Sequence, residues 1–323
     1  MALDPQAQIV IGLVKQSGLP ELWQLTPDQA REQYLLRVSK LAVREPISKS
    51  TDRLIPGPGS ELPIRIYQPR EVKPGELLPV LVWLHGGGFV IGNLDTHDSA
   101  CRMLANRADC LVVAVDYRLA PEFKFPAAVE DSMAALRWVA LHAREIGGDP
   151  ERIAVGGDSA GGNLAAVCAL LARDEGYPRL AFQLLIYPCT APEPETPSHR
   201  KFAEGYVLTR NTVTWFYRHY VRSPKDFYDF RFAPLAADDL SNLPASLVLV
   251  AGYDPLRDEG VDYAKRLIDA GNRVTLANYE GMIHGFYLMG AAVDAAKHAI
   301  AQSAQALREA FAASGPARSI MPR

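Results

Sequence analysis

The chain has 323 residues, of which 48% are hydrophobic and 22% charged, so it contains enough apolar material for a sizeable core. Its net charge of −3 is spread without blocks of one sign, and this excludes the basic surface of a typical nucleic-acid-binding protein. A secretory leader and a membrane-spanning run are not indicated either. We expect a cytoplasmic protein that acts on a neutral small molecule, with no nucleic-acid partner and no stable membrane insertion.

The first 50 residues are predicted to be mainly helical. In the stretch LTPDQAREQYLLRVSKLA, Thr26 is placed as the N-cap, Pro27 at the first helical position and Gln29 where a capping box requires it. Residues 62–70 follow as LPIRIYQPR, in which apolar and polar residues alternate. Such alternation is typical of a half-buried strand, so we expect an antiparallel edge strand here.

Short runs rich in valine, isoleucine and leucine then recur between helical stretches. They span 78–88, 110–118, 152–159, 182–188, 245–254 and 273–281, and most are nearly continuous in apolar residues, as strands buried on both faces require. Helices are predicted between them, for example over 125–145 and over 259–271, where Gly271 is the expected C-terminal cap. The alternation predicts an α/β fold with a mostly parallel sheet covered on both faces.

Residues 190–232 interrupt this alternation with a proline-rich entry and helices dense in aromatic residues. Together with the first 50 residues they are interpreted as a lid over the sheet, although helices packed on an ordinary side of the core remain an alternative. Six aromatic residues are candidates for the wall of an apolar substrate pocket or, equally, for the core of the lid: Phe89, Phe202, Tyr206, Trp215, Phe216 and Tyr220.

Residues 157–161 read GDSAG, the G-x-S-x-G pattern of a nucleophile elbow. A predicted strand precedes this pattern and an apolar helix follows it, which is the context that the motif requires. The small neighbours allow a sharp turn that exposes the Ser159 hydroxyl. We therefore expect Ser159 to be a nucleophile, the alternative being a tight turn without chemistry.

A second motif, HGGG, occupies residues 85–88 directly after an apolar strand. Consecutive glycines allow backbone N–H groups to point into a pocket, and this sequence type is associated with the oxyanion holes of lipases and esterases. The spacings of phosphate-binding loops are absent, and the four cysteines show no metal-ligand pattern. No metal site is expected, and the thiols are expected to be reduced.

A serine hydroxyl needs a base to be nucleophilic near neutral pH. His284 is the histidine placed just beyond a predicted strand, where open α/β sheets position their chemistry. By the same rule Asp254 is the carboxylate expected to orient the imidazole, with Asp258 and Glu259 as alternatives. The order Ser159, Asp254, His284 is that of the α/β-hydrolases.

The chain resembles the hormone-sensitive lipase family of α/β-hydrolases, in its bacterial carboxylesterase branch. The blocks that carry the resemblance are LHGGGFVIG, VDYRLAPEFKFPAAVED, GGDSAGGN, AGYDPLRDEG and MIHGFYLM, and the likeness as a whole runs from about residue 60 to 290. The resemblance implies an eight-stranded core, residues 51–189 and 233–323, under a helical cap formed by residues 1–50 and 190–232. It also implies an oxyanion hole from the amides of Gly87, Gly88 and Ala160.

These observations predict hydrolysis of short- to medium-chain carboxylic esters through an acyl-enzyme on Ser159, without a metal or an organic cofactor. One alternative is an amide or small-peptide hydrolase. Another is a ligand receptor without catalysis, because the plant gibberellin receptors resemble this family but lack the catalytic histidine; the presence of His284 disfavours it. A small-molecule ester is the expected partner, and a homodimer is an open alternative to a monomer.

Overall fold

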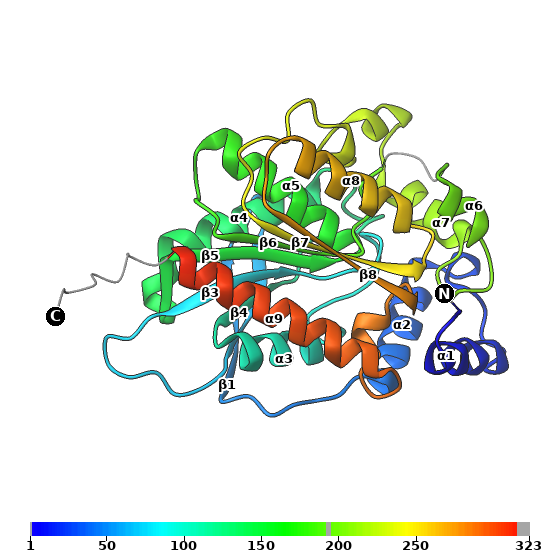
Figure 1. The fold of residues 1–323 in the computed structure, drawn as a ribbon, viewed down its shortest axis with the longest axis horizontal. Coiled ribbons are helices and arrows are strands. Elements are labelled where there is room, and N and C mark those ends of the chain that lie inside the picture. Colours follow the sequence, from blue (N-terminus) through cyan, green and yellow to red (C-terminus); the bar gives the residue numbers. More distant parts are fainter. Residues whose placement is uncertain (1, 192–194, 315–323) are drawn as a thin grey trace.

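The structure is a computed structural model that describes residues 2–191 and 195–314. A twisted eight-stranded sheet runs through the middle, in the order β1-β2-β4-β3-β5-β6-β7-β8 (Figure 1). The strands are β1 (Lys49–Pro56), β2 (Glu61–Gln68), β3 (Leu78–Leu84), β4 (Leu111–Val115), β5 (Gly148–Asp158), β6 (Phe182–Ile186), β7 (Ser246–Tyr253) and β8 (Val274–Ile283).

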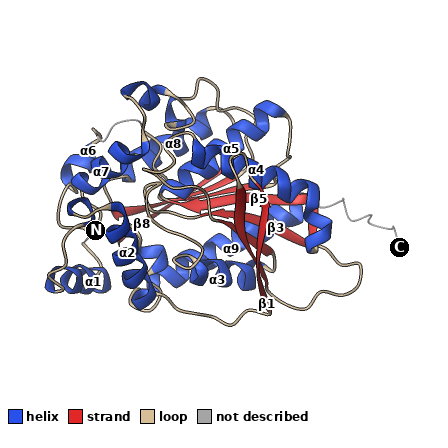
Figure 2. Cartoon of the chain, turned by 180° about the vertical axis from the view of Figure 1, so that it is seen from behind, coloured by secondary structure: helices blue, strands red, loops and turns tan. Residues whose placement is uncertain are grey.

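Helices lie on both faces of the sheet, as Figure 2 shows. The α-helices are α1 (Pro5–Gln16), α2 (Pro27–Leu41), α3 (Asp98–Ala108), α4 (Ala127–His142), α5 (Ala160–Glu175), α6 (Pro197–Lys201), α7 (Arg210–Tyr220), α8 (Arg257–Asp269) and α9 (Asp294–Ser314). Short 3-10 turns occur at η1 (Leu22–Gln24), η2 (Ala143–Ile146), η3 (Pro224–Tyr228), η4 (Pro234–Ala236) and η5 (Phe286–Leu288).

The central strands are buried on both faces, which explains their continuous apolar sequences. Every residue of β3, β4 and β6 is buried. Neighbouring strands are parallel throughout the part of the sheet ordered β4-β3-β5-β6-β7-β8. Helices α4, α5 and α8 pack on one face, and α3 and α9 pack on the other (Figure 1). The predicted α/β fold with a mostly parallel sheet is therefore confirmed.

The prediction for residues 62–70 is only half right. Strand β2 is antiparallel, but it pairs with β1 on one side and with β4 on the other, so it is not an edge strand. The edge is β1, whose eight residues are exposed except for Ile55. Because β1 buries almost no side chain, its sequence KSTDRLIP carries no apolar pattern by which it could be recognised.

The expected signals at helix ends are present. Thr26 accepts a hydrogen bond from the Gln29 amide, while the Gln29 side chain accepts one from the Thr26 amide, so the capping box of α2 is formed. Gly271 follows α8 with a positive φ of 85°, the backbone conformation of a C-terminal cap. Helix α2 ends at Leu41, however, so the first 50 residues are not helical throughout.

Helices α1, α2, α6 and α7 gather beyond one end of the sheet, near the C-terminal end of β8 (Figures 1 and 2). We refer to these four helices as the outer helices. The two chain segments that supply them contact each other, since the Thr209 hydroxyl at the N-cap of α7 donates to the Glu21 carboxylate at 3.0 Å. Segments nearly 200 residues apart thus share one layer over the ends of the parallel strands.

Two further features concern the whole described chain. Within residues 2–191 and 195–314, no helix is both long and apolar enough to cross a membrane. Cys101, Cys110, Cys168 and Cys189 are all buried and form no disulfide in the described structure. Burial raises the pKa of the Cys189 thiol well above its usual value, which keeps that thiol protonated beside the site described next.

Candidate active site

Ser159 lies on a sharp turn between β5 and α5. Its backbone has φ 57° and ψ −116°, a strained conformation for a residue with a side chain. The turn is held because the Ser159 amide donates to the Ile186 carbonyl and the Ser159 carbonyl accepts from the Asn163 amide. A methyl group on Gly161 would overlap the Leu84 carbonyl, so strand and helix approach this closely only with glycine there.

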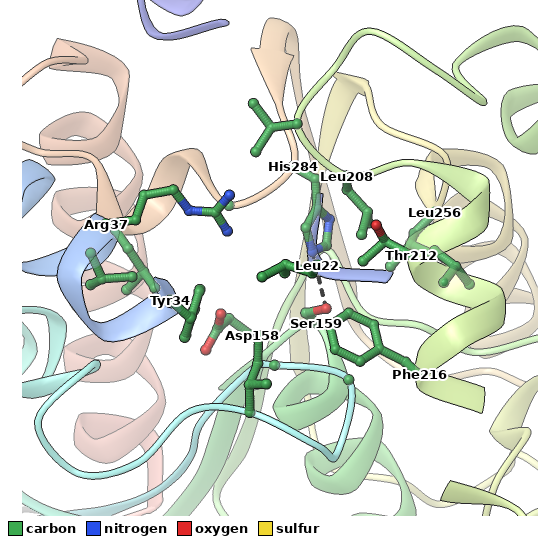
Figure 3. Close-up of a pocket in the computed structure, with 18 of the residues that line it drawn as sticks. Leu22, Tyr34, Arg37, Asp158, Ser159, Leu208, Thr212, Phe216, Leu256 and His284 are labelled. Atoms are coloured by element: carbon green, nitrogen blue, oxygen red, sulfur yellow. Dashed lines mark hydrogen bonds between the residues drawn. The ribbon is translucent and has the colours of Figure 1, made fainter. Parts of the chain in front are cut away.

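Three side chains from separate strand ends meet at this turn. His284 Nε2 lies 3.0 Å from Ser159 Oγ, and His284 Nδ1 lies 2.7 Å from Asp254 Oδ2 (Figure 3). Asp254 follows β7 and is completely buried, whereas the imidazole of His284 follows β8 and is 11% exposed. The arrangement is a serine, an imidazole and a carboxylate in one hydrogen-bonded line, the geometry of an activated nucleophile.

The carboxylate and the imidazole are both held in place. The second oxygen of Asp254, Oδ1, accepts a hydrogen bond from the Leu256 amide at 2.9 Å. The Tyr187 ring packs against the imidazole of His284, with the ring centroids 4.5 Å apart. Asp254 therefore has a partner on each oxygen, and the His284 ring is oriented from two sides.

The alternative carboxylates are engaged elsewhere. Glu259 is buried, lies 2.8 Å from His199 Nε2 and accepts hydrogen bonds from the amides of Thr190 and Ala191. Asp258 accepts a hydrogen bond from the Ser198 amide at the start of α6. Both residues tie α6 to the core, and neither contacts His284.

Three backbone amides lie unpaired around the serine. In the described chain, the N–H groups of Gly87, Gly88 and Ala160 donate to no protein acceptor. Gly87 and Gly88 have positive φ angles of 124° and 58°, and a methyl group on Gly88 would overlap the Phe216 ring. Ala160 is the first residue of α5, where helices leave their N–H groups free. These groups are donors that an oxyanion can accept.

A buried polar network supports the HGGG loop. Asp158 Oδ1 accepts from the Gly86 amide and lies 3.0 Å from His97 Nε2, while the Tyr117 hydroxyl donates to the His85 carbonyl. Burial opposes ionisation of Asp158, but His97, His85 and the Gly86 amide outweigh it and hold the pKa of this carboxyl below its usual value. Burial, reinforced by His97, lowers the pKa of His85 to about 3, so the His85 ring is neutral near pH 7.

The serine opens into a pocket with a cavity of about 100 Å³, bounded mainly by apolar side chains. The core contributes Ser159, His284, Gly87 and Gly88 (Figure 3). The outer helices contribute two facing groups, from α2 and from α7: Tyr34, Arg37, Val38 and Leu41, and Thr212, Val213, Phe216 and Tyr217.

Of the six aromatic residues considered for the wall, Phe216 lines the pocket and the other five do not. For Trp215 and Tyr220, helical geometry explains this difference, because only one side of α7 faces the cavity. Trp215 packs against His219 on the next side, Tyr220 stacks on Phe89 at 3.9 Å, and Phe202 contacts Tyr206 and Tyr253. The alternative interpretation, core of the helical layer, agrees with the burial of Phe202 and Tyr220, whereas Tyr206 and Trp215 are only partly buried and Phe89 lies in the loop after β3.

The sequence analysis missed the contribution of α2. Tyr34, Arg37, Val38 and Leu41 stand at positions i, i+3, i+4 and i+7, so they share one side of the helix. That spacing was the signal by which the sequence could have indicated a covered side of α2. It marks a side of α2 that is covered, but it does not tell whether a pocket or the core covers it.

The fold and the site together define a hydrolase with a nucleophile elbow on an open α/β sheet. A family described as the alpha/beta hydrolase fold matches residues 81–288. The chain therefore belongs to the α/β-hydrolases and, with its esterase relatives, to their hormone-sensitive lipase family; its enzymatic class is that of the carboxylic ester hydrolases.

Individual proteins are similar over most of the chain. An ethyl acetate hydrolase of Pseudomonas putida is 39% identical over 96% of this chain and 99% of its own length. The carboxylic ester hydrolase LipN of Mycobacterium tuberculosis is 49% identical over 73% of this chain, and the match covers 64% of LipN's own length. A solved ester hydrolase, EH1AB1 from the metagenome of Lake Arreo, superposes with a TM-score of 0.92 at 42% identity, over 96% of this chain and 99% of its own.

Proposed function

We propose that this chain hydrolyses short- to medium-chain carboxylic esters through a covalent acyl-enzyme on Ser159. The observation that carries the proposal is the pair of short contacts made by His284, 3.0 Å to Ser159 Oγ and 2.7 Å to Asp254 Oδ2. Such contacts let one imidazole accept the serine proton while a buried carboxylate stabilises the resulting positive charge.

The reaction has two halves. Ser159 Oγ attacks the ester carbonyl as its proton passes to His284 Nε2, and the amides of Gly87, Gly88 and Ala160 bind the oxyanion of the tetrahedral intermediate. His284 then protonates the leaving alcohol, which departs. In the second half a water molecule gives a proton to His284 and attacks the acyl group, releasing the carboxylic acid and restoring Ser159.

We further propose that the outer helices form the substrate cap, drawn from residues 1–50 and 190–232 over a core of residues 51–189 and 233–323. Side chains of α2 and α7 line the pocket beside Ser159, and this supports the assignment. A cavity of about 100 Å³ supports short or medium acyl chains rather than long fatty acyl chains.

A chromogenic ester series from acetyl to palmitoyl tests the proposal, with wild-type and Ser159→Ala protein. We expect turnover to fall steeply for the longest chains, and Ser159→Ala to reduce kcat by about 10⁴-fold or more. Full activity in the Ser159→Ala variant would falsify the mechanism. A matching anilide in the same assay separates ester from amide hydrolysis, and we expect the ester to be the much better substrate.

A further inference from the structure

One cationic side chain faces the substrate pocket. The guanidinium of Arg37 extends from α2 into the cavity, toward the side that holds Ser159 and His284 (Figure 3). Asp158 is the one carboxylate among the described residues that line this pocket. Its Oδ1 is occupied by the Gly86 amide and His97, and it forms no ion pair with Arg37. No ion pair among the described residues that line the pocket therefore involves Arg37.

Arg37 is unlike the other partly buried arginines of the described residues. Within residues 2–191 and 195–314 it forms no hydrogen bond and no ion pair, and its guanidinium carbon lies 5.6 Å from the centroid of the Tyr34 ring. Every other partly buried arginine in that part of the chain donates to a carboxylate or a carbonyl. Arg31, on the same helix, pairs with Glu122 and donates to the carbonyls of Val90 and Ala120.

The surroundings of Arg37 are apolar. Tyr34, Val38 and Leu41 share its side of α2, and α7 presents Val213 and Phe216 to the same cavity. Arg37 is partly buried, and burial lowers the pKa of its guanidinium. Its N–H groups have no acceptor among the described residues, so an anion that reaches the guanidinium would supply one.

We propose that Arg37 selects esters that carry a carboxylate group remote from the scissile bond, such as half-esters of dicarboxylic acids. This inference rests on the proposed esterase function and adds the class of substrate. A carboxylate matches the guanidinium because two parallel N–H···O hydrogen bonds can form, whereas a neutral ester leaves these donors unpaired. The methylene chain between the two ends would lie against the apolar wall.

The first test compares substrates that differ only in charge. An aryl half-ester of glutaric acid is compared with the aryl pentanoate, which places the carboxylate in the acyl part. Acetylated 4-hydroxybenzoate is compared with its methyl ester, which places the carboxylate in the alcohol part. For each pair the quantity measured is the ratio of kcat/KM for the anionic ester to kcat/KM for the neutral one.

Arg37→Met removes the charge at similar side-chain length, and Arg37→Lys keeps it. We expect Arg37→Met to lower the ratio by about 10- to 100-fold in at least one pair, because it removes a hydrogen-bonded ion pair. Arg37→Lys is expected to retain part of the preference. Lys40→Met is the matched control, since Lys40 is an exposed cation on the same helix, and its ratio should equal the wild-type ratio.

A binding measurement separates this inference from the esterase function itself. In the Ser159→Ala background, calorimetry gives the Kd of the glutarate half-ester with Arg37 present and with Arg37→Met added. We expect Kd to rise about tenfold or more without the arginine. If the protein turns over no ester, the proposed function fails while this measurement still reports on Arg37. Ratios unchanged by Arg37→Met in both substrate pairs, together with an unchanged Kd, would overturn the proposal.

Discussion

The two sides of the pocket differ in how their polar groups are satisfied. On the core side, Ser159, His284 and Asp254 are joined by hydrogen bonds, and Asp158 is held by Gly86 and His97. On the side of the outer helices, the wall is mostly apolar and its cation, Arg37, has no partner within the described residues.

In the proposed mechanism, this difference separates the bond-breaking chemistry from the choice of substrate. A catalytic side chain must be held close to its working geometry before the substrate arrives, so Ser159, His284 and Asp254 already have their partners, while the amides of Gly87, Gly88 and Ala160 are held in place by the backbone. A recognition group does the opposite: it gains its partner only when the substrate binds. An unpaired charge in an apolar wall is therefore informative about the ligand, whereas a paired charge is informative about the scaffold.

The largest expected loss of activity comes from a substitution of Asp254, on the core side of the pocket. Asp254→Asn keeps the shape but removes the charge that stabilises protonated His284, so kcat should fall by about 10⁴-fold. Hydrolysis of an acetyl ester measures the loss. Asp258→Asn is the matched control because Asp258 lies four residues on and contacts Ser198 instead. Equal losses in the two variants would contradict the assignment of Asp254.

A smaller effect is expected where the two sides touch, at Gly88 and Phe216. In Gly88→Ala the new methyl group would overlap the Phe216 ring and displace an oxyanion donor, so kcat should fall by about 10²- to 10³-fold. Gly75→Ala is the control, since Gly75 also has a positive φ but has open space around it. Wild-type turnover in Gly88→Ala would show that this amide has no role in the reaction.

The smallest of these effects concerns stability and its pH dependence. Asp158→Asn should lower the free energy of unfolding at pH 7 by about 2 kcal/mol, because the buried charge paired with His97 is lost. The folded-state pKa of Asp158 lies below its unfolded value, so its stabilisation is present above about pH 4 and disappears as the pH falls through the folded-state pKa.

Urea unfolding at pH 7 and at pH 3 measures this contribution. The difference between wild type and Asp158→Asn should be smaller at pH 3. Asp262→Asn serves as the control, since Asp262 pairs with Lys265 at the surface and should change the unfolding free energy by less than about 1 kcal/mol at either pH. A difference that stays constant between the two pH values would contradict the role of the ionised Asp158 carboxylate.

The sheet could be anticipated from local pattern because its central strands are buried on both faces and read as continuous apolar runs. Ser159 and Asp254 were proposed from the same pattern, since each directly follows such a run, and His284 was proposed because it follows the predicted strand β8 and parallel strands end at one edge. Strand β1 was missed because its exposed side chains leave no hydrophobic signal. For the six aromatic residues, the pocket wall and the core of the lid were left as alternatives, and Phe216 alone of the six lines the pocket, because composition does not tell which side chains face a cavity.

Local sequence was thus sufficient for the nucleophile elbow, the glycine loop and the α/β framework, because each depends on residues adjacent in the chain. The pocket wall depends on how α2 and α7, from segments far apart in sequence, pack over the strand ends. A low net charge favoured a neutral substrate, yet folding places one unpaired arginine in the cavity. Charge summed over a chain is insensitive to position, and only the packed structure decides which charges remain without a partner.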